Sequence, residues 1–187
     1  MVKTAKSFIL IALVAGSGAM QPTRGDTITV EPDGKVTFSP PFSMSHHEDP
    51  YPELPMTSVT YTIDDPTNGP GQVSFMGTTA LWMVPHPSTF TNRVTTISEL
   101  KQLIDACAAQ GPQRTNISDS IIKFHGQDAV EGIGYFGNAW HDEIIMYWGE
   151  PKKRNDNAIF VIDSQATKKE ICQALVAGVT VAPPKGN

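Results

Sequence analysis

The strongest constraint on the fold is an alternation of apolar and polar residues that ends in a turn. In residues 59–63, three apolar side chains alternate with two threonines. The sequence Asp-Pro-Thr-Asn-Gly-Pro-Gly at 65–71 then reverses the chain into the apolar residues of 73–75. Residues 27–38 repeat this arrangement around a Glu-Pro-Asp-Gly turn. Both segments predict β-hairpins and therefore an antiparallel sheet.

Two helices are predicted among these strands. The first covers residues 97–109 and follows Thr96, while the second covers residues 168–177 and follows Thr167. Each threonine is followed three residues later by a glutamate, which is the pattern of a capping box. We therefore expect an α+β fold in which five to seven short antiparallel strands are packed by one longer and one short helix.

The composition divides the chain into four segments. Residues 1–19 are predicted to be a signal peptide, and residues 20–58 a hairpin followed by a proline-rich arm, because proline interrupts helices and central strands. Residues 59–178 are expected to form a single α+β domain, with a further strand at 78–84. The proline-containing end, residues 179–187, is expected to be a flexible tail.

The N-terminal segment predicts export from the cytoplasm. Lys3 and Lys6 precede the apolar run 8–15, and the small residues 17–19 suit a cleavage site. The run is too short for a lasting membrane span, although an uncleaved anchor is the alternative. Cleavage would change the net charge from −5 to −7, which argues against nucleic-acid partners. We therefore expect a secreted or periplasmic protein without a stable membrane anchor.

Cys107 and Cys172 are the two cysteines of the chain. In an oxidising compartment the default interpretation is one disulfide between them. The chain-entropy model assigns roughly 4 kcal/mol to a bridge closing a loop of this length. The alternative is a catalytic cysteine beside a histidine, which would leave the other thiol free.

The C-terminal half resembles the globular head of a type IVb pilin. The resemblance is carried by Cys107, the glycine-rich residues 132–137, the Asn-Ala-Trp sequence at 138–140, the strand-like residues 160–162 and Cys172. The membrane-embedded N-terminal helix of that family is absent from the expected mature chain. The resemblance thus implies a soluble pilin-like or pilus-associated component, accessory or adhesive, whose partners are pilus or cell-surface proteins.

One cluster suggests a catalytic alternative. His141 adjoins Asp142 and Glu143, and a histidine near carboxylates can transfer protons near neutral pH. These three residues are the candidates for a secreted hydrolase, and Trp140 and Tyr147 are candidate interaction residues. The competing structural interpretation is the start of a strand with Trp140 in the core. Because no nucleophile stands in a recognisable setting, a non-catalytic binding or structural role is the first expectation.

His46 and His47 supply a second alternative, a periplasmic metal-binding protein. Neighbouring side chains of an extended segment point in opposite directions, so two adjacent histidines do not readily share one ion. A Gly-x-Gly-x-x-Gly pattern occurs within residues 132–137, but no strand and crossover helix frame it as a dinucleotide site requires. We accordingly expect no cofactor.

Overall fold

A computed structural model describes residues 28–29, 36–48, 56–78, 96–108, 118–147 and 159–182. The expected signal peptide (1–19), the expected strand at 78–84 beyond its first residue, and residues 183–187 of the expected tail lie outside the described residues.

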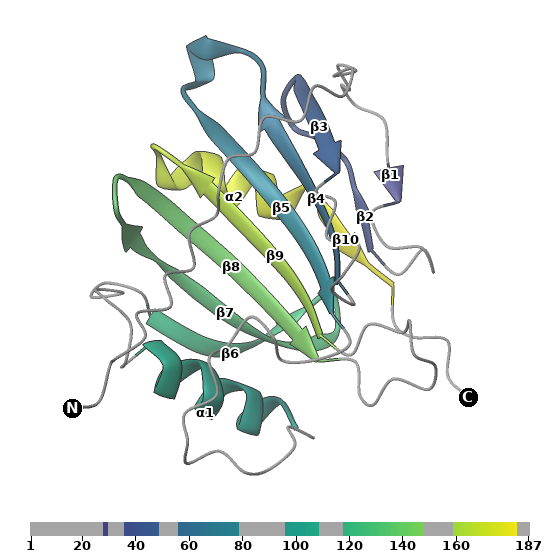
Figure 1. Ribbon diagram of the computed structural model, residues 1–187, viewed down its shortest axis with the longest axis vertical. Helices are drawn as coiled ribbons and strands as arrows, with labels where there is room; N and C mark the ends of the chain where they lie inside the picture. The colour runs from purple at the N-terminus through teal and green to yellow at the C-terminus, as the bar shows by residue number, and fades with distance from the viewer. Residues whose placement is uncertain are drawn as a thin grey trace, which may run out of the picture.

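Most of the described chain forms a seven-stranded antiparallel sheet with the order β3-β4-β5-β9-β8-β7-β6 (Figure 1). Its strands are β3 (Met44–Glu48), β4 (Met56–Ile63), β5 (Gly71–Thr78), β6 (Ser118–Phe124), β7 (Gln127–Phe136), β8 (Ala139–Tyr147) and β9 (Ile159–Ala166). A second sheet has the order β1-β2-β10, comprising β1 (Ile28–Thr29), β2 (Val36–Phe38) and β10 (Val179–Val181). The helices are α1 (Ile97–Ala108), α2 (Lys169–Ala177) and the short 3-10 turn η1 (Pro66–Asn68).

The two helices pack on opposite faces of the main sheet. Because successive side chains of a strand point to opposite sides, a single strand can contact both helices. Along β8, Ile144 and Met146 join the core cluster that contains the apolar side of α2. Ile145 and Tyr147 join a separate cluster with Leu100 and other residues of α1. We call the two sides the α2 face and the α1 face; in Figure 1, α2 lies behind the sheet.

The predicted disulfide between Cys107 and Cys172 is wrong. Cys172 is a free, buried thiol on α2, whereas Cys107 belongs to α1. A disulfide holds its two Cα atoms within about 7 Å of each other, and here a complete sheet separates the two helices. The expected α+β class remains, but it is dominated by antiparallel strands and contains no bridge at Cys172.

The first helix begins as predicted and the second does not. The Thr96 hydroxyl accepts from the Glu99 backbone N–H at 3.2 Å, and a Glu99 carboxylate oxygen accepts from the Thr96 N–H at 3.1 Å. In α2 the N-cap is Lys168, which makes no side-chain capping bond. Thr167 is instead held outside the helix, because its N–H donates to the carbonyl of Pro70 at 3.3 Å.

Two strands form where the sequence predicted irregular structure. Residues 44–48 lie in the expected proline-rich arm, but no proline falls between residues 42 and 49, so the backbone donors of β3 can pair with β4. Residues 179–181 lie in the expected tail, yet Val179 and Val181 are buried and pair with Phe38 and Val36. Alternation within this Val-Thr-Val segment accounts for a strand with one buried side.

The strands β6 and β7 form a long hairpin. Its two-residue turn is His125-Gly126, with φ of 48° and 82°. Positive φ at both central residues suits a type I′ turn, whose twist matches that of paired strands. The glycines at 132 and 134 lie within β7 and that at 137 in the following turn, with no helix after them. The glycine pattern is therefore part of the sheet.

Candidate functional site

The hydrolase candidates on β8 separate onto two faces. His141 lies opposite Gln165 and Glu143 lies opposite Asp163, which places both on the α1 face. Asp142 lies opposite Ser164 on the α2 face, close to Cys172. His141 and Glu143 therefore share a surface, whereas Asp142 belongs to a different environment.

The carboxylate that the structure brings to His141 is Asp163 of β9. Its Oδ1 lies 3.5 Å from Nδ1 of His141, and its Oδ2 accepts a 2.7 Å hydrogen bond from Nε2 of Gln165. Asp163 is only 7% exposed, and its buried Oδ1 accepts no hydrogen bond. The side chain of His141 is 17% exposed. A buried carboxylate thus orients two side chains that lie nearer to the surface.

These residues belong to a wider set of polar side chains on the α1 face, some of them buried, which we call the polar half-face. The strand registers align its ten side chains in two rows across five strands. One row is Ser45, Thr62, Gln72, Gln165 and His141; the other is His47, Thr60, Ser74, Asp163 and Glu143. Within the second row, the buried hydroxyls of Thr60 and Ser74 are 2.9 Å apart and hydrogen bonded.

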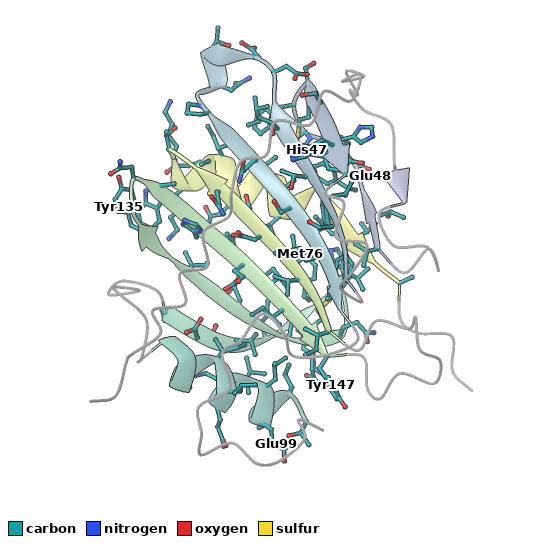
Figure 2. The ribbon with its side chains drawn as sticks, viewed as in Figure 1. His47, Glu48, Met76, Glu99, Tyr135 and Tyr147 are labelled. Carbon is teal, nitrogen blue, oxygen red and sulfur yellow. The ribbon has the colours of Figure 1, made fainter. Side chains whose placement is uncertain are left out.

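Part of the remaining α1 face is apolar. The next row of the register contains Met76, Val161 and Ile145, and these pack in the cluster of α1. Figure 2 shows Met76 closer to the α1 end of the sheet than His47. The apolar residues of this face therefore contribute to folding through α1, while the polar half-face lies beyond them.

Asp142 occupies an unusual position on the α2 face. It is 3% exposed, and its buried Oδ1 has no hydrogen-bond partner. Burial, followed by the nearby charge of Glu131, raises the pKa of Asp142 to about 6, although Lys169 acts in the opposite direction. This carboxyl group is therefore poised to change charge just below neutral pH.

Cys172 is held as an unreactive thiol. Its Sγ donates to the carbonyl oxygen of Trp140 at 3.1 Å. Burial is the main reason that the pKa of Cys172 rises to about 11. Because the thiolate is the nucleophilic form, this thiol is a poor nucleophile at neutral pH, which disfavours Cys172 as a catalytic cysteine.

The two aromatic candidates also lie on different faces. Trp140 is half-buried on the α2 face, where its ring centroid lies 5.7 Å from that of Tyr135 in an edge-to-face arrangement and 5.5 Å from the Lys169 ammonium. Tyr147 packs against the α1 cluster. Figure 2 shows Tyr135 and Tyr147 near opposite ends of the sheet. Trp140 and Tyr147 therefore do not form one binding surface.

His46 and His47 likewise point in opposite directions. His46 stacks on Tyr61 with ring centroids 5.2 Å apart, on the α2 face, whereas His47 lies opposite Thr60 on the polar half-face. Within the described ranges there is no group of three or more histidine, cysteine or acidic side chains placed to hold a metal ion. The two histidines are thus not assembled into a common set of ligands.

Comparisons with protein-family models, curated proteins and solved structures found no match to this chain. Among the described residues, none of the helices has the length and apolar character required to cross a membrane.

Asp163 and Gln165 are the site residues that sequence reasoning missed. The sequence predicted a strand only at residues 160–162, whereas the observed strand, Ile-Phe-Val-Ile-Asp-Ser-Gln-Ala at 159–166, changes from apolar to polar halfway. That change was the sequence signal that could have indicated polar site residues in the second half of this strand. Pairing Asp163 with His141 additionally required the register of β8 against β9, which the local sequence does not contain.

Proposed function

We propose that this protein is an exported, non-catalytic binding protein that recognises a positively charged, hydrogen-bonding group with its polar half-face. The main support for this proposal is the position of Asp163, a buried carboxylate beneath His141 and Gln165. A buried charge lowers stability unless it is compensated, so a carboxylate at this depth favours a cationic partner. His141, Gln165 and Gln72 add hydrogen-bonding capacity around it.

The pairing across β8 and β9 strengthens the argument for a cation. Glu143 and Asp163 stand directly opposite each other on the same face. Like charges in this position are mutually repulsive in a sheet. A guanidinium or ammonium group between or above them would offset the repulsion and donate charge-assisted hydrogen bonds to the carboxylate oxygens.

The arrangement supports binding better than hydrolysis. Ser74 is the hydroxyl of the second row closest to Asp163, but it lies on β5, two strands from His141 on β8. Two strand spacings are about 9.5 Å, beyond hydrogen-bond reach. Cys172 is on the other face and protonated. Among the described residues, His141 therefore has neither of these candidate nucleophiles within reach.

Export and a cell-surface partner are further parts of the proposal. They are supported by the composition of residues 1–19 and by the acidic net charge, which suits a basic protein surface. A pilus-associated role is one form of it. Deletion of the protein from its source should then alter surface filaments or adhesion, and unchanged filaments and adhesion would contradict that role.

The binding proposal is tested by NMR titration of isotope-labelled protein with L-arginine amide and a short arginine-containing peptide. We expect shifts of the β8 and β9 amides and of the His141 ring. Asp163→Asn should weaken binding about tenfold or more, because it removes the buried charge. Asp128→Asn, at an exposed pair on another hairpin, serves as the matched control and should bind like the wild type.

Three outcomes distinguish the alternatives. Loss of binding in Asp163→Asn alone supports the proposal. Equal binding of a neutral glutamine amide, or absence of shifts with every cationic probe, contradicts charge recognition.

The contact between His141 and Asp163 is the specific observation that favours a second candidate, a secreted hydrolase, since such a carboxylate can orient a general base. In that case His141→Ala should abolish turnover while the protein remains folded. Full activity in this variant would exclude a catalytic histidine.

A further inference from the structure

The strand β6 forms one edge of the seven-stranded sheet. It pairs with β7 over all seven of its residues, and among the residues that the structure describes the strand order ends at β6. Its Ser118, Ser120 and Lys123 are exposed, and Ile121 is 43% exposed, one of two large apolar side chains exposed in the described chain. An edge of this kind is a template for pairing with another strand.

The hairpin geometry determines which backbone groups of β6 point outward. In a hairpin with a two-residue turn, the flanking residues, here Phe124 and Gln127, exchange both backbone hydrogen bonds. Hydrogen-bonded pairs alternate along an antiparallel ladder, so Ile122 also bonds to β7. The N–H and C=O groups of Asp119, Ile121 and Lys123 therefore point away from β7.

These three residues are self-complementary about Ile121. We propose that β6 pairs with β6 of a second copy of this chain, around a two-fold axis at Ile121. In this antiparallel register, Ile121 lies opposite its own copy, and Asp119 of each chain lies opposite Lys123 of the other. All three pairs use the outward backbone groups, and both charge pairs bring together opposite signs on one face.

The charges explain why the proposed partner is a second copy. An edge lysine ordinarily discourages strand pairing, but Asp119 supplies its counter-charge at the symmetry-related position. Lys123 already contacts Asp128 at 2.8 Å; both side chains are highly exposed, and such surface pairs contribute little. The opposite edge, β3, provides a contrast: pairing about His46 would place Met44 against Glu48, without charge complementarity.

The consequence is a continuous fourteen-stranded sheet in which both copies of α1 lie on the same face. This dimer does not depend on the polar half-face, which lies on strands β3, β4, β5, β9 and β8. The two proposals can therefore fail separately.

Charge exchange tests the dimer by sedimentation velocity. The wild type should dimerise in a concentration-dependent way. Lys123→Glu sets two acidic side chains against each other at both symmetry-related pairs, and Asp119→Lys sets two lysines against each other there. Each variant should therefore weaken dimerisation about tenfold or more. An equimolar mixture of the two variants restores a favourable pair of opposite charges on each side of the axis and should form heterodimers. Asp128→Asn should dimerise like the wild type.

Circular dichroism verifies that each variant is folded; Lys123→Glu is the decisive single variant because Lys123 is exposed. A wild type that stays monomeric at millimolar concentration would overturn the proposal. So would a dimer that persists unchanged in folded Lys123→Glu, because that dimer would use another surface.

Discussion

At the scale of single residues, Asp142 gives the fold a specific pH dependence. Its pKa of about 6 lies above its ordinary value of 3.8, because burial penalises the charged form. The folded state therefore binds the proton more tightly than the unfolded state. The stability that protonated Asp142 contributes through this tighter binding is fully present below about pH 3.8 and is lost as the pH rises through about 6.

Replacing this carboxyl group should remove the pH dependence. The difference between the two pKa values corresponds to at most about 3 kcal/mol. We expect Asp142→Asn to unfold in urea like the wild type at about pH 4 and to be about 1–3 kcal/mol more stable at about pH 8. A constant difference between the two proteins across this range would contradict the assignment.

The recurring feature of the site at this scale is that partners come from neighbouring strands. His141 was identifiable from sequence because it adjoins two acidic residues. Alternation along β8 then shows that Asp142 points away from it, whereas Asp163 is contributed by the next strand along the chain, β9. Only the β8–β9 register makes that pairing visible.

At the scale of elements, the junction after α2 depends on a close backbone approach. Gly178 receives a hydrogen bond at its carbonyl from the Ser39 N–H, at 2.9 Å. A Cβ atom added at Gly178 would lie 2.6 Å from the carbonyl oxygen of Ser39 and 3.2 Å from Phe38. Its φ of −73° is ordinary, so the requirement for glycine here is one of space.

Gly178→Ala should therefore destabilise the protein although alanine is the better helix former. We expect a loss of about 1–3 kcal/mol in the free energy of unfolding, because the clash would separate β2 from the end of α2. The urea midpoint measures it, with circular dichroism to establish that the variant folds. An unchanged or higher midpoint would show that this junction has room to adjust.

The sequence predicted elements best where the signal was local. The Thr96 capping box and the buried stripe of α2 are set by residues within one or two helical turns, and both are present. The strand β7 was obscured because Gly132 and Gly134 resemble turn residues. In the sheet they lie opposite Glu143 and His141, a relationship that depends on pairing with β8.

At the scale of the whole molecule, the main sheet separates two environments. One face carries the apolar side of α2 and the core shared with the small sheet, while the other carries α1 at one end and the polar half-face beyond it. The disulfide prediction failed at this scale. It rested on compartment and cysteine number, which carry no information about the side of the sheet on which each helix packs.

The separation of α1 and α2 is the central claim, and counting thiols tests it most directly. The protein would be unfolded without reductant, alkylated with iodoacetamide and weighed by mass spectrometry, alongside a sample alkylated while native. We predict two labels after unfolding, at Cys107 and Cys172, and no label at Cys172 in the native sample, since its thiol is buried and protonated. An unfolded monomer that takes up no label at either cysteine would show a bridge between the helices and contradict their placement on opposite faces.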